Sequence, residues 1–156
     1  MVRRSCFLSY LSVRTIRSAG VYTLPGIPSV YYGSEFGLEG KKEWGSDAFL
    51  RPALSLAELK SQDNACLQII KSLGEIYKAQ NALWYGEYRE MDLNTRYAFM
   101  RGDLLITVTN SDAEEWFDLG LDGTYVGALH GRKIGSDNGR MRFTLEGNSA
   151  EIWIPA

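Results

Sequence analysis

Apolar and polar positions along the chain follow three patterns in succession. Ile27–Tyr32 is apolar on both faces and is bounded by Gly and Pro, which is typical of a buried strand in a parallel sheet. A stretch with helical spacing follows between residues 64 and 78. From Leu83 onward, apolar residues alternate with polar ones at a period of two. The pattern therefore predicts a strand, a helix and an all-β module, in that order.

The helix is the clearest of these elements. Its apolar residues recur at one face of a 3.6-residue period: Cys66, Ile69, Ile70, Leu73, Ile76 and Tyr77. Asp63 or Asn64 is suited to cap its first turn. The spacing predicts a packed helix over Asn64–Lys78. Just before it, Ser55 and Glu58 have the spacing of a capping box and predict a short helical turn.

The alternating region divides into short strands separated by turn residues such as Gly102-Asp103 and Asp137-Asn138-Gly139. The predicted strands are Trp84–Met91, Thr95–Arg101, Leu104–Asn110, Glu115–Leu119, Thr124–Leu129, Arg140–Leu145 and Ala150–Ile154. Short strands at this spacing indicate an antiparallel β-sandwich or barrel. The chain as a whole is therefore predicted to be mainly β, with a βα unit before the sandwich.

Composition narrows the functional classes. The chain has 156 residues, a net charge of -2 and 45% hydrophobic residues, so it is predicted to fold and shows no general attraction to nucleic acid. A complete (β/α)8 barrel needs roughly 250 residues and does not fit. No apolar run is long enough to span a membrane. The two cysteines, Cys6 and Cys66, make no disulfide framework, and we expect a cytoplasmic protein.

Residues 1–20 differ from the rest of the chain. They contain four arginines and no acidic residue, and serines interrupt any apolar segment of the kind a signal peptide needs. We interpret them as an irregular leader. The switch to a period of two then divides the remaining chain at about residue 80, which predicts a region 21–80 and a β-sandwich domain 81–156.

The residues themselves offer little catalytic chemistry. His130 is the only histidine, and the spacing typical of a serine nucleophile or a zinc site is absent, so we predict no metal and no cofactor. The acidic residues Glu35, Glu39, Glu43 and Asp47 lie in a glycine-rich loop of the type that carries function in α/β enzymes. Their spacing alone does not establish a catalytic pair.

One segment, however, resembles a specific family motif. The run Thr23–Gly37, with its Pro-Gly-Ile-Pro and Tyr-Tyr-Gly-Ser-Glu elements, resembles the last-strand motif of the α-amylase superfamily, glycoside hydrolase family 13. The following segment Asp47–Pro52 resembles one that some members place beside the sugar. The helix resembles the eighth barrel helix, and residues 83–156 resemble domain C, the antiparallel sandwich that follows the barrel. The resemblance thus divides the chain into a leader, a barrel remnant (21–80) and domain C.

The resemblance implies a retaining α-glycosidase that acts on α-glucans such as maltooligosaccharides, with Asp47 and Arg51 as substrate-binding residues. Family members carry their nucleophile aspartate, acid/base glutamate and stabilising aspartate upstream of this motif, and none of these residues is present here. Retaining hydrolysis needs two carboxyl groups about 5 to 5.5 Å apart. We therefore expect a C-terminal fragment of such an enzyme, without catalytic residues and without activity alone.

Two other functional classes remain open. The aromatic residues Trp84, Tyr85, Tyr88 and Trp116 would suit a carbohydrate-binding module. A structural or association domain is the other class, because the predicted strand Ile27–Tyr32 has no partner strand in the sequence and is expected to self-associate through its edge. For Arg51, pairing with Asp47 to hold the loop in place is the alternative to sugar contact.

Overall fold

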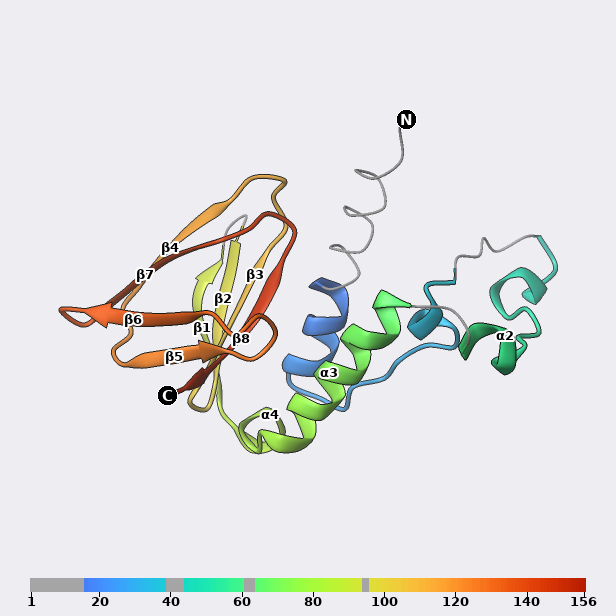
Figure 1. Ribbon diagram of the computed structural model, residues 1–156, viewed down its shortest axis with the longest axis horizontal. Helices are drawn as coiled ribbons and strands as arrows, with labels where there is room; N and C mark the ends of the chain where they lie inside the picture. Colours follow the sequence, from blue (N-terminus) through green and yellow to red (C-terminus); the bar gives the residue numbers. More distant parts are fainter. Residues whose placement is uncertain (1–15, 39–43, 61–63, 94–95) are drawn as a thin grey trace.

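The computed structural model describes residues 16–38, 44–60, 64–93 and 96–156 (Figure 1). Eight antiparallel strands form one sheet in the order β1-β2-β3-β8-β5-β6-β7-β4. Their bounds are Tyr88–Leu93 (β1), Arg96–Arg101 (β2), Leu104–Thr109 (β3), Glu115–Leu119 (β4), Thr124–Gly127 (β5), Lys133–Asp137 (β6), Arg140–Leu145 (β7) and Ala150–Pro155 (β8). These strands are called the sheet module below. The predicted mainly β, antiparallel fold is confirmed.

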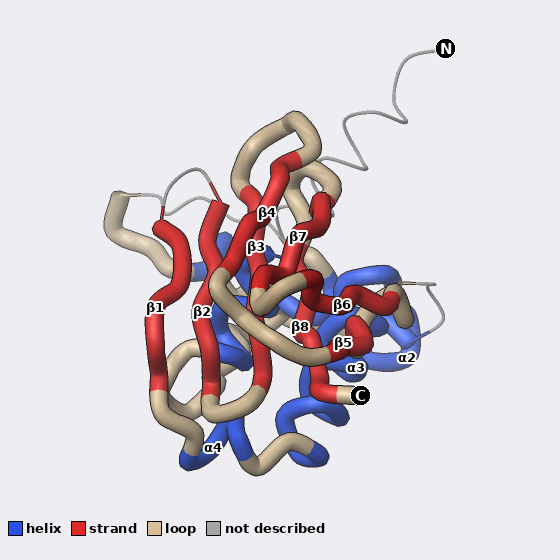
Figure 2. Tube along the Cα trace, turned by 90° about the vertical axis from the view of Figure 1, so that its left-hand side faces the viewer, coloured by secondary structure: helices blue, strands red, loops and turns tan. Residues whose placement is uncertain are grey.

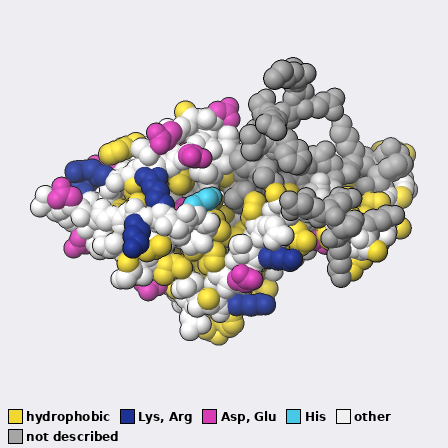
Figure 3. All heavy atoms as spheres, in the orientation of Figure 1, with side chains coloured by type: hydrophobic (Ala, Val, Ile, Leu, Met, Phe, Trp, Pro, Cys, Tyr) yellow, Lys and Arg dark blue, Asp and Glu magenta, His cyan; other side chains and the backbone are white. Residues whose placement is uncertain are grey.

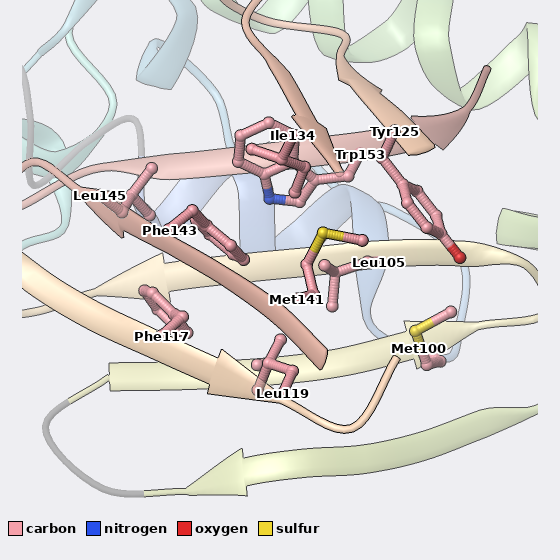
Figure 4. Close-up of a cluster of buried hydrophobic side chains, with 11 residues drawn as sticks. Met100, Leu105, Phe117, Leu119, Tyr125, Ile134, Met141, Phe143, Leu145 and Trp153 are labelled. Carbon is pink, nitrogen blue, oxygen red and sulfur yellow. The ribbon is translucent and has the colours of Figure 1, made fainter. Parts of the chain in front are cut away.

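The sheet curls around an apolar interior. Arg96 at the start of β2 donates a hydrogen bond to the Trp116 carbonyl in β4, so the two ends of the strand order approach each other. Side chains from seven strands meet inside, where the rings of Phe117 and Phe143 stack with centroids 5.1 Å apart (Figure 4). The Trp153 indole N–H is satisfied within this core by the Thr107 hydroxyl at 2.8 Å. Inward-facing residues thus follow the predicted period of two.

The outer face of the sheet is covered by helices (Figure 2). Helix α3 spans Ala65–Ala79, and the Asn64 side chain caps it by accepting the backbone N–H of Cys66 at 2.9 Å. Its buried Leu73 packs with Ile152 of β8. The predicted helix is therefore confirmed to within one residue at each end. Among the described residues, no helix has both the length and the apolar character needed to cross a membrane.

A second helix, residues 16–23, lies beside α3. Its Ala19 is fully buried in the same cluster as Leu73. This helix crosses residue 20, the boundary that the composition suggested between leader and remnant. The rest of the expected leader, residues 1–15 with Cys6, lies outside the described residues.

The predicted strand at Ile27–Tyr32 is wrong. Residues 27–31 have irregular backbone and residues 32–33 form a turn, and the Ile27 side chain is 93% exposed. The physical reason is that a strand needs a neighbouring backbone to satisfy its N–H and C=O groups. None of the described segments pairs with residues 27–32. Apolar side chains alone therefore did not produce a strand.

Two expectations in the alternating region also need correction. Trp84 and Tyr85 do not belong to the first strand but to a short helix, α4, Ala82–Tyr85. The missed strand is β6, in which Ile134 is the only buried residue, so its sequence shows no clear alternation. Asn138 and Gly139, both with positive φ, form the two-residue turn that joins β6 to β7. That Asn-Gly pair was the signal that should have predicted β6.

The connection from the 27–38 segment to α3 contains short helical turns. They are η1 (Ser34–Phe36), η2 (Ala48–Leu50) and α2 (Leu56–Lys60). The Leu59 N–H donates to the Ser55 carbonyl at 3.1 Å, in agreement with the turn predicted from the capping-box spacing. Figure 1 shows the part that contains α2 at the end of the molecule farthest from the sheet module.

Candidate functional site

The motif residues 31–38 form a tight, glycine-dependent turn. Gly33 has a φ of 78°, a conformation that favours glycine, and a Cβ at this position would lie 2.4 Å from Leu38 Cδ1. The Ser34 N–H donates to the Tyr31 carbonyl at 3.0 Å, and η1 follows immediately. The turn therefore fixes the direction in which Tyr31 and Tyr32 leave the backbone.

Both tyrosines reach the second motif segment, about twenty residues later. The Arg51 Nε–H donates to the Tyr31 hydroxyl at 3.1 Å. The Tyr32 hydroxyl donates to the Pro52 carbonyl at 2.9 Å. The two segments that carried the resemblance in the sequence are thus in direct contact, and we call Tyr31, Tyr32, Asp47 and Arg51 the tyrosine–arginine cluster.

The predicted residues Asp47 and Arg51 both lie in this cluster, at the two ends of η2, and both are exposed. The hydrogen bond to Tyr31 raises the pKa of Arg51, and the negative charge of Asp47 adds to this effect. Asp47 therefore lies close enough to Arg51 to influence it electrostatically. The structure brings an acceptor carboxylate and a donor guanidinium together on one exposed surface.

A groove of about 370 Å³ begins beside Tyr31. It lies between helix 16–23, the segment 29–38 and α3. Its lining mixes apolar side chains with hydroxyl and cationic groups: Arg17, Ser18, Val21, Tyr22, Ser29, Val30, Tyr31, Ser34, Leu38, Cys66, Ile69 and Ile70. The Cys66 thiol in this lining is free. The groove provides concave space next to the tyrosine–arginine cluster.

Of the remaining carboxylate candidates, Glu35 alone lies within the described residues. Glu35 is half-buried in η1, whereas Glu39 and Glu43 lie outside the described residues. In the part of the chain that the structure describes, no three His, Cys, Asp or Glu side chains are grouped so as to hold a metal ion.

The four aromatic candidates do not form one surface. Trp84 and Tyr85 are neighbours on α4, with ring centroids 6.1 Å apart, and they are 45% and 84% exposed. Tyr88 packs against Phe99 of the sheet at 5.4 Å, so it serves the core. Trp116 lies on β4 at the edge of the sheet and is 52% exposed. Only Trp84 and Tyr85 are brought together.

His130, the only histidine of the sequence, has a buried partner. Its Nδ1 lies 2.8 Å from a carboxylate oxygen of Glu151, although its side chain remains 61% exposed and is visible at the surface (Figure 3). Glu151 also accepts the backbone N–H groups of Leu129 and Ile152. A Cβ on Gly127 would lie 2.6 Å from this carboxylate, so a larger residue there would displace the Glu151 side chain. An acidic residue within the apolar strand Ala150–Ile154 was the signal for this pair.

Sequence reasoning also missed Arg101. Its buried guanidinium donates to the carbonyls of Thr23 at 2.8 Å, Leu83 at 2.9 Å and Gly86 at 3.3 Å. Burial lowers the pKa of Arg101. These carbonyls belong to helix 16–23, to α4 and to the residue after α4, so one side chain on β2 joins three segments. Arg101 holds the helices onto the sheet module.

No family model matches the sequence. A curated relative, the cyclomaltodextrin glucanotransferase of Klebsiella oxytoca, is 27% identical over 143 residues, which cover 83% of this chain and 21% of that protein. Ttha1563 from Thermus thermophilus is 27% identical with a TM-score of 0.78, over 92% of this chain and 31% of that chain. An α-amylase from Anoxybacillus is 22% identical with a TM-score of 0.82, over 94% of this chain and 32% of that chain.

The chain therefore spans about a fifth of the curated relative and about a third of these structures. A cyclomaltodextrinase structure is also similar, with a TM-score of 0.76 over 91% of this chain. The matched portion includes the sheet module, which resembles the C-terminal β-sandwich of amylases. Over most of its length, the chain is similar to the C-terminal portion of enzymes of the α-amylase superfamily, glycoside hydrolase family 13.

Proposed function

We propose that this chain is the C-terminal part of an α-amylase-type glycoside hydrolase that acts on α-glucans, and that Asp47 and Arg51 contact the sugar. The observation that carries the proposal is the contact between the two motif segments, through Arg51 with Tyr31 and through Tyr32 with Pro52. Similar structures include AmyP, solved with maltotriose and with maltose, and a Geobacillus thermoleovorans α-amylase complexed with acarbose.

The chemistry of the cluster suits vicinal hydroxyl groups. A guanidinium has five N–H donors in a rigid plane, and the Nε donor of Arg51 is engaged by Tyr31. A carboxylate such as Asp47 offers only acceptors. Together they can donate to one hydroxyl of a pyranose and accept from the next. Because Tyr31 already holds the Arg51 side chain, less rotamer freedom is lost when a sugar binds.

We also propose that the chain alone does not hydrolyse α-glucans. The resemblance places the nucleophile, the acid/base and the stabilising carboxyl group upstream of residue 23. Without such a pair, binding groups cannot supply the barrier reduction of about 8 kcal/mol or more that enzymes provide. We expect no release of reducing sugar from α-1,4- or α-1,6-glucans. Release that disappears in Glu35→Gln or Asp47→Asn would contradict this and indicate a local catalytic pair.

Titration with maltotriose, followed by calorimetry and by the NMR signal of the Arg51 Nε–H, tests the contact. Arg51→Ala and Asp47→Asn should each weaken binding by roughly tenfold, because each removes a charge-assisted hydrogen bond. The matched control is Arg140→Ala, since Arg140 is an exposed arginine that pairs with Asp118 on the sheet module. Equal affinities in all three variants would contradict the proposed sugar contact.

A second candidate function, association with another polypeptide, is favoured by exposed apolar side chains. Ile27 is 93% exposed, Trp44 is fully exposed and Val30 is 40% exposed, and all three precede α3 in the sequence. Because residues 27–32 are not a strand, edge-to-edge pairing no longer supports this candidate. Apolar area alone supports it.

A further inference from the structure

Four aromatic rings form a continuous row across the helices. Tyr22 of helix 16–23 meets Tyr77 of α3 at 6.1 Å, Tyr77 stacks on Trp84 of α4 at 5.8 Å, and Trp84 lies 6.1 Å from Tyr85. Exposure rises along the row, from half-buried Tyr22 and Tyr77 to Tyr85, which is 84% exposed. The row therefore ends in an aromatic pair, Trp84 and Tyr85, that faces solvent.

Hydrogen bonds and ring stacking fix the position of this aromatic pair. The Trp84 indole N–H donates to the Tyr77 carbonyl at 2.6 Å, and its ring stacks on Tyr77 with planes 30° apart. The backbone beneath the pair is fixed as well, because Arg101 binds the carbonyls of Leu83 and Gly86 on either side of it. A ligand that stacks on these rings would find them already ordered, which lowers the cost of binding.

Polar residues flank the pair in the sequence. Exposed Lys78, Asn81 and Glu87 lie next to it in the sequence, and Figure 3 shows charged side chains over α3 beside the apolar ones at this end of the molecule. Two exposed rings on α4 are a small apolar area for a protein interface. A pyranose matches it better, because one of its faces is made of C–H groups and its edge carries hydroxyls.

We infer that Trp84 and Tyr85 form a second α-glucan-binding surface, separate from the tyrosine–arginine cluster. The ligand class rests on the proposed function, whereas the place and the residues come from the aromatic row. Helix α4 follows the C-terminal end of α3, while the segment with Asp47 and Arg51 lies toward its other end (Figure 1). The two surfaces can therefore be tested independently.

The test is retardation of the full chain in native gels that contain soluble starch, with the unfolding midpoint of each variant as a check on folding. Tyr85→Ala should reduce retardation roughly tenfold in apparent affinity without changing the unfolding midpoint, because the ring is mostly exposed. Trp84→Phe keeps a ring on Tyr77 and should reduce retardation less. Trp116→Ala is the control, since it removes a ring that is 52% exposed, similar to the 45% of Trp84, from the edge of the sheet.

Each outcome decides between the two sites. Loss of retardation in Tyr85→Ala, with retention in Trp116→Ala, supports the surface on α4. Retention in Tyr85→Ala with loss in Arg51→Ala overturns this inference and leaves the proposed function intact. An unretarded wild-type chain also overturns the inference, while the maltotriose titration still reports on Asp47 and Arg51. Equal loss in Tyr85→Ala and Trp116→Ala indicates general adsorption to exposed rings and overturns it too.

Discussion

Strands β3 and β8 and the segment 27–32 have equally apolar sequences, but the segment 27–32 does not form a strand. Strand β3 has β2 on one side and β8 on the other, its inner side chains meet the core, and its outer ones are covered by helices. The segment 27–32 has no paired neighbour among the described residues, and Ile27 is exposed. The comparison shows that an apolar run becomes a strand only where a second backbone satisfies its hydrogen bonds.

The sheet module and the helices that precede it nevertheless stabilise each other. The outer face of the sheet module carries Phe99, Leu104 and Ile106, and these are buried with Leu83 and against Ile76 and Tyr77 of α3. Arg101 then ties the end of helix 16–23 to the same face. Residues 27–32 have no strand pairing, yet the helices on either side of them complete the core of the sheet module.

The largest effect should come from separating the two regions. Residues 83–156 expressed alone are expected to keep a strand-type circular dichroism spectrum and cooperative unfolding, because the interior core comes from the strands themselves. Their midpoint in urea should fall strongly, and the dye ANS should bind the uncovered outer face. A random-coil spectrum would show instead that α3 is indispensable to the core.

A smaller but still large effect is expected from Arg101→Met. The substitution removes the donor of three carbonyl groups, two of them in buried hydrogen bonds, and a loss of about 3 kcal/mol in the free energy of unfolding is expected. The measurement is urea unfolding of the full chain. The control is Arg142→Met, since Arg142 is a half-exposed arginine on β7 that lies 3.5 Å from Asp118. Similar losses of unfolding free energy in both variants would contradict a specific role of Arg101 in connecting the helices to the sheet module.

Self-association should weaken when an exposed apolar residue that precedes α3 is made polar. Sedimentation of the full chain is expected to show dimers or larger species, and Ile27→Ser should shift the distribution toward monomer. The matched control, Leu93→Ser, removes an apolar side chain that is 62% exposed on the sheet module. A monomeric wild-type chain, or an equal effect of Leu93→Ser, would contradict association through the residues that precede α3.

The smallest effect concerns the pH dependence of stability. Burial, together with the hydrogen bond between the Tyr97 and Tyr88 hydroxyls, raises the pKa of Tyr97 to about 12. The unfolded chain has a tyrosine pKa of about 10. The unfolded state therefore loses its proton first, and stability should fall as the pH rises from about 10 to about 12.

Urea midpoints measured at increasing pH should show this fall, and Tyr97→Phe should reduce its slope. Tyr85→Phe is the control, because Tyr85 is mostly exposed. A slope that Tyr97→Phe leaves unchanged would assign the pH dependence to other groups, such as Tyr125, whose pKa is also raised by burial.

Local patterns predicted the elements whose partners are close in the sequence. Helix α3 appeared because its apolar stripe is contained in fifteen residues, and its cap, Asn64, is adjacent. The hairpin of β2 and β3 appeared because Gly102-Asp103 supplies its turn. Strand β6 was not predicted, because Ile134 is its only buried residue and its sequence shows no clear alternation. For the candidate site, the sequence named Asp47 and Arg51, but not the contact of Arg51 with Tyr31.

By itself, the sequence determined most of the antiparallel strands and the packed helix, because short-range periodicity and turn residues encode them, whereas the two motif segments were identified by their resemblance to a family. Only the tertiary structure decided that 27–32 is not a strand, that Trp84 and Tyr85 end an aromatic row, and that Glu151 and Arg101 are buried with partners. Each of these depends on a donor, acceptor or ring that is distant in the sequence. Whether a polar group can be buried, or a backbone left unpaired, is decided by partners that no local pattern records.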